Sequence, residues 1–345
     1  MPNLPPTCEL LTGRWAREFH CGRIVGSSAP LANAIAQGGE PARYEYSRFT
    51  RSASIPIVSP ERNSRPAING HNIRECRSSC REGAYGRTLA NMRFRIGTAG
   101  WTVPKQHRTV FSASADGTKL SHLELYARRL QCVEINSSFH RPHRPATWER
   151  WAAVTPDYFR FAVKAPKAIT HTAKLVNTGG ALLEFFDAVR ALGDKLGPVL
   201  IQLPPKLTFV EGIAQEFLTT LRELHQGGVV LEPRHASWFS APVDSLLRNF
   251  QVSRVAADPP KGSELASEPG GWPGLTYWRL HGSPRTYYSE YDHDWLQGLA
   301  KRLQSVESRS GDNEAWVIFD NTVLGHATAN AVWLNDALRH DYTRG

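Results

Sequence analysis

Residues 159–203, FRFAVKAPKAITHTAKLVNTGGALLEFFDAVRALGDKLGPVLIQL, contain one complete strand–helix–strand repeat. The apolar runs at 159–163 and 199–203 have the length of buried strands, and a helical segment lies between them. One face of that predicted helix is apolar and consists of Leu182, Phe185, Phe186, Val189 and Leu192. Two buried strands joined by a helix with one apolar face are typical of a parallel sheet covered by helices.

The same alternation continues on both sides of this repeat. Eight apolar runs of strand length occur at 94–96, 133–135, 159–163, 199–203, 229–231, 254–257, 276–280 and 316–319. Amphipathic stretches follow most of them, but 259–274 is too rich in Gly and Pro for a good helix. Eight strands with helical returns in about 250 residues predict an α/β fold, a TIM (β/α)₈ barrel. An open doubly wound sheet is the main alternative, but residues 97–101 (GTAGW) lack its GxGxxG spacing.

The first 91 residues differ in composition from the rest of the chain. They contain 12 Arg and 7 Glu but no Lys or Asp, so they contribute 12 − 7 = +5 to a net charge of +9. Residues 47–86 are rich in Arg, Ser, Pro and Gly and show no strand or helix periodicity. We predict that residues 1–91 are a disordered extension, or a spurious one that precedes the natural start at Met92, and that residues 92–341 form the barrel domain.

Cysteine usage and hydropathy indicate the compartment. After Met92 the sequence has a single cysteine, Cys132, which is typical of a reducing compartment and is expected to be a small buried side chain. The four earlier cysteines have no CxxC spacing, so a zinc site is not predicted. The chain has no apolar run long enough for a membrane helix and does not open like a secretory signal. The sequence therefore predicts a cytoplasmic protein with no membrane partner, and it does not determine the oligomeric state.

Polar residues gather at the carboxyl ends of the predicted strands. In chain order they are Glu134, Asn136, Lys164, Gln202, Glu232, Arg234, His235, Asp258, Arg279, His281, Asp320 and Asn321. In a barrel these strand ends surround one mouth, so the repetition predicts a convergent site there.

Each of these residue types suggests a role. The cations expected to bind an anionic group of the substrate are Lys164, Arg234 and Arg279. Glu134 or Glu232 is expected to be the general base, and His281 the proton shuttle, because histidine titrates nearest neutral pH. The other predicted substrate-binding residues are Asn136, Asp258, Asp320, Trp101 and Trp238. The predicted function is hydrolase or isomerase chemistry on a phosphorylated substrate. The alternative is a barrel that binds nucleic acid or a phosphorylated ligand without catalysis.

The same residues have alternative roles, such as ion pairing or core packing, that do not involve a substrate. The carboxylates can instead pair with the cations, since buried charges need partners, and we expect Lys164 to be such a paired lysine rather than a Schiff-base nucleophile. No cofactor is predicted. A divalent metal is the alternative, with ligands from Glu134, Glu232, Asp258, Asp320 and either His281 or His171. Lys167, His171 and Lys174 form either an anion-binding rim or a solvated loop. Trp101 and Trp238 either stack on a ligand or cap the core.

Seven blocks of sequence resemble a known family. They are IGTAGW (96–101), VEINSSFHR (133–141), TPDYFRFAVKAPKAITH (155–171), LGPVLIQLPP (196–205), LEPRHASWF (231–239), YWRLHG (277–282) and VIFDNT (317–322). In this order they are similar to the domain of unknown function 72, or YecE-like, family over residues 92–340. The resemblance implies a TIM barrel and no particular activity. Ala99, Pro233 and Asp320 depart from the usual residues, and Asp320 puts a carboxylate where an amide is common.

Overall fold

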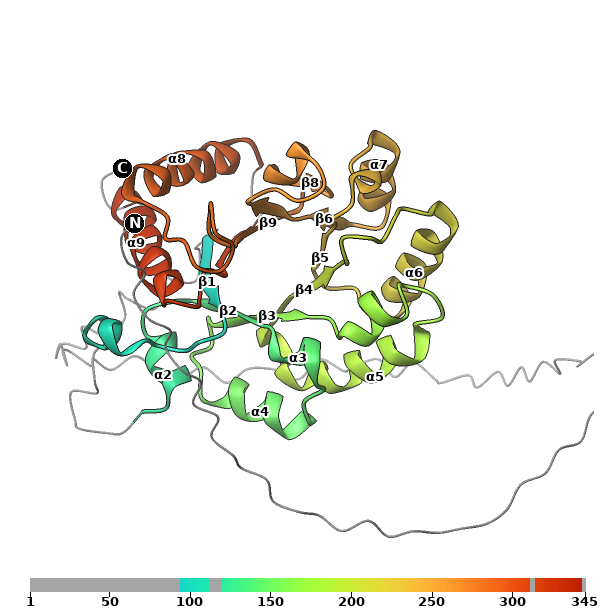
Figure 1. The fold of residues 1–345 in the computed structure, drawn as a ribbon. Helices are drawn as coiled ribbons and strands as arrows, with labels where there is room; N and C mark the ends of the chain where they lie inside the picture. Colours follow the sequence, from blue (N-terminus) through green and yellow to red (C-terminus); the bar gives the residue numbers. More distant parts are fainter. Residues whose placement is uncertain (1–93, 112–119, 311–313, 343–345) are drawn as a thin grey trace, which may run out of the picture. The chain divides into compact units, whose positions relative to one another are not determined.

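The computed structural model describes residues 94–111, 120–310 and 314–342. The predicted extension at residues 1–91 lies outside these ranges and stays a prediction. In the described part, strands form a ring and helices surround it (Figure 1). The predicted TIM (β/α)₈ barrel is therefore confirmed. None of the described helices is both long and apolar enough to cross a membrane.

The elements follow the predicted order. The strands are β1 (Phe94–Ala99), β2 (Cys132–Ile135), β3 (Arg160–Lys164), β4 (Leu196–Gln202), β5 (Val229–Glu232), β6 (Val252–Arg254), β7 (Ala256–Asp258), β8 (Gly270–Gly271), β9 (Leu275–Leu280) and β10 (Glu314–Phe319). The α-helices are α2 (His122–Ala127), α3 (Ser137–His140), α4 (Pro145–Ala153), α5 (Gly179–Val189), α6 (Glu211–Leu224), α7 (Ala241–Asn249), α8 (His293–Ser310) and α9 (His326–Tyr342).

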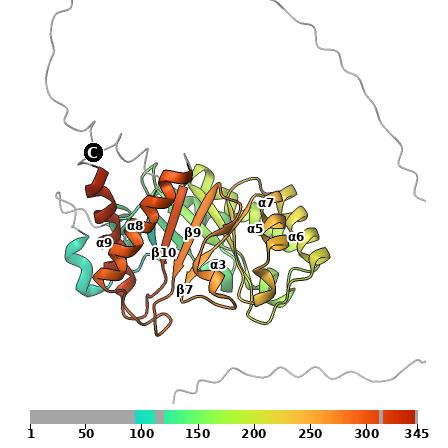
Figure 2. The ribbon, with the colours of Figure 1, turned by 90° about the horizontal axis from the view of Figure 1, so that it is seen from above.

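The ring closes through a strand that is divided in two. The first half, β6, pairs with β5. After a single residue, Val255, the second half, β7, begins and pairs with β9. Every described strand pair is parallel except the short pair of β8 with β6. Figure 2 shows β9 and β10 side by side in this ring. The weak crossover predicted at 259–274 is confirmed, because it holds only a 3₁₀ turn at Glu264–Ser267 and β8.

Apolar side chains pack on both sides of the sheet. The predicted apolar face of α5 and the turn after it is buried in the larger core between helices and strands. A smaller cluster alternates with it along the strands and fills the ring interior. Cys132 belongs to this inner cluster as a free, buried side chain, as predicted.

The inner face of the barrel changes from apolar to polar near the strand ends. Steps of two residues, which keep the same face of a strand, lead from Cys132 to Glu134, Ala162 to Lys164, Leu200 to Gln202, Val230 to Glu232, Tyr277 to Arg279 and Ile318 to Asp320. The lower layers of the ring are therefore packed with apolar groups. Polar and charged groups form the layer at the carboxyl-terminal mouth.

β1 and β2 approach each other closely at Gly97. A Cβ atom at this position would lie 2.2 Å from the main-chain oxygen of Cys132. Only glycine fits there without movement of the β1–β2 pair, on which the position of the mouth depends.

Candidate functional site

Arg279 on β9 is the centre of a buried charge network at the mouth. Its side chain is 1% exposed. Its Nε donates to Oε2 of Glu134 at 2.9 Å, and its Nη2 donates to Oε1 of Glu134 at 2.8 Å. Nη1 donates to Oε2 of Glu232 at 2.6 Å, and Nη2 also donates to Oδ2 of Asp320 at 3.1 Å. The structure thus brings together predicted site residues from four different strand ends.

The two glutamates have further partners. The Tyr277 hydroxyl donates to Oε2 of Glu134 at 2.9 Å. Gln202 Nε2 donates to Oε2 of Glu232 at 2.9 Å, and Arg234 donates to Oε1 of Glu232 from Nε at 3.1 Å and from Nη2 at 3.0 Å. Glu134 is 0% exposed, and both of its oxygens accept hydrogen bonds. This geometry argues against both Glu134 and Glu232 as the general base, because both oxygens of each buried carboxylate are occupied in holding arginines and their neighbours.

His281 lies on the same strand face as Arg279, as predicted. Its Nδ1 is 2.9 Å from Oδ2 of Asp320, and its Nε2 is 3.4 Å from Oε1 of Glu232. Burial and the Arg279 guanidinium lower the pKa of His281, but the hydrogen bonds to the two carboxylates outweigh them and the pKa is raised. The ring of Tyr287 packs edge-on against the imidazole, with 5.8 Å between centroids.

The charges of this network balance when His281 carries a proton. The carboxylates of Glu134, Glu232 and Asp320 face the guanidiniums of Arg234 and Arg279, which leaves 3 − 2 = 1 negative charge. Burial raises the pKa of Glu232, but the Arg279 guanidinium more than reverses this and holds it well below its usual range. The predicted ion pairs of both arginines are therefore present.

Three of the four carboxylates of the alternative metal site, Glu134, Glu232 and Asp320, already have a cationic partner. They converge on the guanidinium of Arg279 rather than on an open position. No group of three or more His, Cys, Asp or Glu residues within 94–111, 120–310 and 314–342 is arranged to hold a metal ion.

Lys164, the last residue of β3, is not part of this balance. Its side chain is 8% exposed, and its Nζ lies 4.2 Å from the ring centroid of Phe139. It forms no direct ion pair with any described residue, so of the predicted pairing with a glutamate only the longer-range attraction to Glu134 and Glu232 is present. The reason is that Arg279 occupies the carboxylates. Burial, followed by the Arg279 guanidinium, lowers the pKa of Lys164 to about 8, although the charges of Glu134, Glu232 and Asp320 act in the opposite direction.

Further positive groups lie near Lys164. The His171 ring packs edge-on against Phe139 at 5.0 Å. Burial lowers the pKa of His171, and the charges of Lys164, Arg234 and Lys167 lower it further. We call Lys164, Lys167 and Arg234 the cationic rim, and His171, whose charged form is disfavoured, lies beside it. The sequence spacing grouped Lys167, His171 and Lys174. Lys174 is not among the charges that act on His171, so the rim differs from that group.

The two tryptophans predicted to stack on a ligand pack against the protein. Trp238 is 2% exposed, its Nε1 donates to the main-chain oxygen of Leu207 at 2.9 Å, and its ring contacts Phe209. It has no exposed face for a ligand, so its predicted stacking role is wrong. Trp101 is half-buried, and its ring packs edge-on against Trp151 of α4, 4.9 Å away. It joins the outer core, as the alternative for this residue proposes.

Asn136 and Asp258 lie beside the network without joining it. Asn136 precedes α3, and its Oδ1 is buried with no hydrogen-bond partner among the described residues. Asp258 ends β7, and its Oδ1 accepts a hydrogen bond from the Tyr291 hydroxyl at 2.9 Å. The main-chain N–H of His281 donates to the main-chain oxygen of Asp258 at 2.7 Å, so Asp258 borders the mouth.

Comparison with known proteins agrees with this fold. The sequence profile of the family described as "Protein of unknown function DUF72" matches residues 95–344. The chain belongs to the DUF72 family. The UPF0759 protein YunF of Bacillus subtilis (strain 168) is 25% identical over 280 residues, which cover 72% of this chain and 95% of YunF. The UPF0759 protein YecE of Escherichia coli (strain K12) is 33% identical over 109 residues, which cover 32% of this chain and only 37% of YecE.

Two crystal structures of DUF72 family proteins share the architecture. The protein from Thermotoga maritima MSB8 has 23% sequence identity and a TM-score of 0.56, over 71% of this chain and 99% of that one. The protein from Enterococcus faecalis V583 has 19% identity and a TM-score of 0.59, over 71% of this chain and 95% of that one. At this level of identity the likeness supports the fold.

A hollow lies at the end of the DUF72 barrel opposite the mouth. It has a volume of about 370 Å³ and is lined by residues near the strand starts, including Arg222 and Glu314. Four main-chain carbonyl groups accept hydrogen bonds from Arg222, and Glu314 pairs with Arg95 at 2.7 Å. These charged groups already have partners. Because active sites of barrels lie at the carboxyl-terminal face, we place the candidate site at the mouth.

Three contributors to the site in this DUF72 chain had no role assigned from the sequence, although Gln202 is among the polar strand-end residues named there. Tyr277 holds Glu134, Gln202 holds Glu232, and Phe139 lies against Lys164. Strand alternation could have identified two of them. Tyr277 lies two residues before Arg279 and therefore on the same face of the strand, and Gln202 ends β4. Phe139 lies in the helix after β2, where alternation gives no direction.

Proposed function

We propose that this chain is an enzyme that moves protons on a small phosphorylated substrate bound at the mouth of its barrel. The observation that carries the proposal is Lys164, a nearly buried ammonium group with no ion pair in the described residues. The carboxylates of Glu134, Glu232 and Asp320 act on this ammonium only from beyond direct contact, and an anionic group of a substrate would supply a directly bound counter-charge. Arg234 is 19% exposed at its side chain and offers a guanidinium, which suits phosphate geometry.

His281 is the proton carrier in this proposal. Because its pKa is raised, more of its imidazole is protonated near neutral pH than in an ordinary histidine, and the imidazolium can donate a proton and take it back. Asp320 and Glu232 hold the imidazole from its two nitrogens. Tyr287 covers it, so the proposal includes displacement of this exposed side chain when substrate binds. Hydrolysis and isomerisation both use such a proton carrier.

Ligand binding by the full chain tests the proposal. Inorganic phosphate and phosphorylated sugars are compared with unphosphorylated sugars by thermal shift and calorimetry. The phosphorylated compounds are expected to raise the melting temperature, since a ligand that binds only the native state stabilises it. Turnover of any compound that binds is followed by phosphorus NMR.

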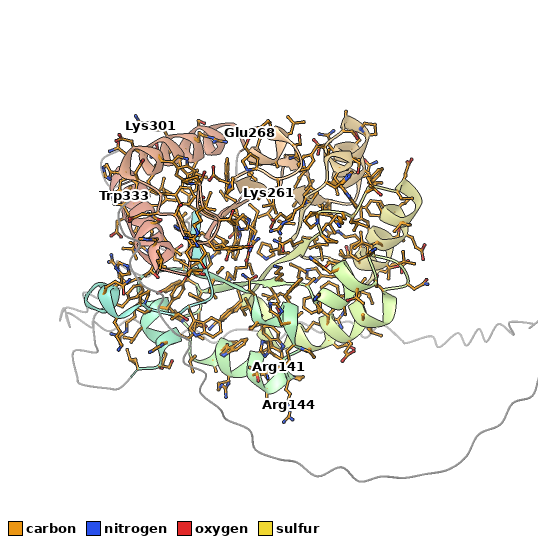
Figure 3. The ribbon with its side chains drawn as sticks, in the orientation of Figure 1. Arg141, Arg144, Lys261, Glu268, Lys301 and Trp333 are labelled. Carbon is orange, nitrogen blue, oxygen red and sulfur yellow. The ribbon has the colours of Figure 1, made fainter. Side chains whose placement is uncertain are left out.

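Variants assign the binding to the mouth. Lys164→Met is expected to weaken phosphate binding about 10–150-fold, which corresponds to loss of one charge-assisted hydrogen bond of about 1.5–3 kcal/mol. Lys301→Met is the matched control, because Lys301 is an exposed residue of α8 at the outer edge of the molecule (Figure 3). Equal binding by the two variants would refute the proposal. Binding of DNA or RNA alone, with a steep dependence on salt, would instead support the nucleic-acid alternative.

A further inference from the structure

We infer that Lys164 is a nucleophile that forms an imine with an aldehyde or ketone group of the substrate. The inference rests on the proposed function, because it uses the same mouth and the same anion. It also narrows the substrate class to a carbonyl compound that carries a phosphate group.

The main chain fixes the position of Lys164. The Ser138 hydroxyl donates to the main-chain oxygen of Lys164 at 2.7 Å, which ties the end of β3 to α3. The N–H of Ala165 donates to the main-chain oxygen of Leu200 at 2.9 Å, which ties it to β4. Lys164 shares its strand face with Ala162 of the inner cluster, so its side chain belongs to the barrel interior. A reactive group on a rigid strand end is already oriented before substrate arrives.

The surroundings of Nζ differ from those of a structural lysine. A lysine paired with a carboxylate stays protonated and is a poor nucleophile. Here Arg279 takes Glu134 and Glu232, and the face of Phe139 lies over Nζ. With its pKa lowered to about 8, about one Lys164 in ten is neutral at pH 7, compared with about one in three thousand for an ordinary lysine.

The proposed step is balanced without a cofactor or a redox partner. The neutral Nζ attacks the carbonyl carbon and a C–N bond forms. One proton then passes from this nitrogen to the carbonyl oxygen, which gives a neutral carbinolamine. A proton carrier such as His281 protonates the hydroxyl group, the C–O bond breaks, and one water leaves as the C=N bond forms. The protonated imine keeps the positive charge over the Phe139 face, which stabilises it as it does the ammonium. The phosphate can then be held by the exposed Lys167 and by Arg234, which also binds Glu232.

Pyridoxal 5′-phosphate is a suitable probe, because it is an aldehyde that carries a phosphate. The full chain is treated with one equivalent of the probe, and sodium borohydride then adds hydride to the imine carbon and fixes the adduct as a secondary amine. The protein is digested, and the modified lysines are mapped by mass spectrometry. We expect the adduct on Lys164 in at least about tenfold excess over the exposed control Lys301. Inorganic phosphate should compete, and pyridoxal without its phosphate should react less.

Lys164→Arg separates this inference from the proposed function. Arginine keeps the positive charge but does not form the imine, so phosphate binding should be retained and the adduct lost. Lys164→Met should lose the adduct and show the weakened phosphate binding expected above. If the wild-type chain binds phosphate but carries no adduct at Lys164, the imine inference is overturned and the proposed function stands. If the wild-type chain does not bind phosphate, both are overturned. The wild-type map gives these answers without requiring a variant to fold.

Discussion

Replacing Glu134 with glutamine should destabilise the barrel strongly, because it removes the negative charge that holds Arg279. Both side chains are nearly inaccessible, and Arg279 donates to both oxygens of Glu134. Breaking a buried ion pair costs about 3–5 kcal/mol, and we expect about 3 kcal/mol, because Arg279 keeps Glu232 and Asp320. For a domain of about 250 residues this corresponds to a fall in melting temperature of about 6–12 °C.

The assay is urea unfolding followed by circular dichroism, with calorimetry for the melting temperature. Glu268→Gln is the matched control, because Glu268 also pairs with an arginine, Arg302 at 2.7 Å, but its side chain is 60% exposed. Exposed pairs contribute about 0–1 kcal/mol. If the two substitutions lower the free energy of unfolding by the same amount, the reasoning about the buried network is refuted.

Two further predictions concern His281 and Gly97. The pKa of His281 is raised above its ordinary value of 6.5 in the folded chain, so its protonation stabilises the fold fully below that value, and this contribution is lost as pH rises through the folded pKa. The loss of unfolding free energy in His281→Asn should therefore be larger at about pH 5.5 than at about pH 8.5; a constant loss in urea titrations would contradict this. Gly97→Ala should lower the free energy of unfolding by about 1–3 kcal/mol, because its Cβ meets the main chain of Cys132. At Gly298 in α8 a Cβ meets nothing within 4 Å, so Gly298→Ala should raise the free energy of unfolding by about 0.5–1 kcal/mol. Calorimetry of both alanine variants checks the order, and a reversed order would contradict it.

The strand-end residues show how far local sequence predicts a site. Glu232, Arg279 and Asp320 each lie two residues after a buried residue that faces the ring interior. The structure brings their side chains together. Trp238 follows a strand end too, but it belongs to a short turn after β5, where no periodicity fixes direction. A tryptophan in such a turn looks the same in sequence whether it faces a ligand or the core. Its burial could be learned only from its contacts with Leu207 and Phe209.

By itself, the sequence determined that the chain forms a ring of eight buried strands with helices outside, and that polar groups line one end of it. Burial and alternation are local properties that repeat within a few residues. Only the tertiary structure decided which charges meet. Glu134 and Arg279 are 145 positions apart, and their pairing depends on the closure of the ring between β7 and β9 and on the stagger of its strands. Because that closure gives the carboxylates to Arg279, Lys164 is left without an ion pair among the described residues, and no local pattern could have predicted that.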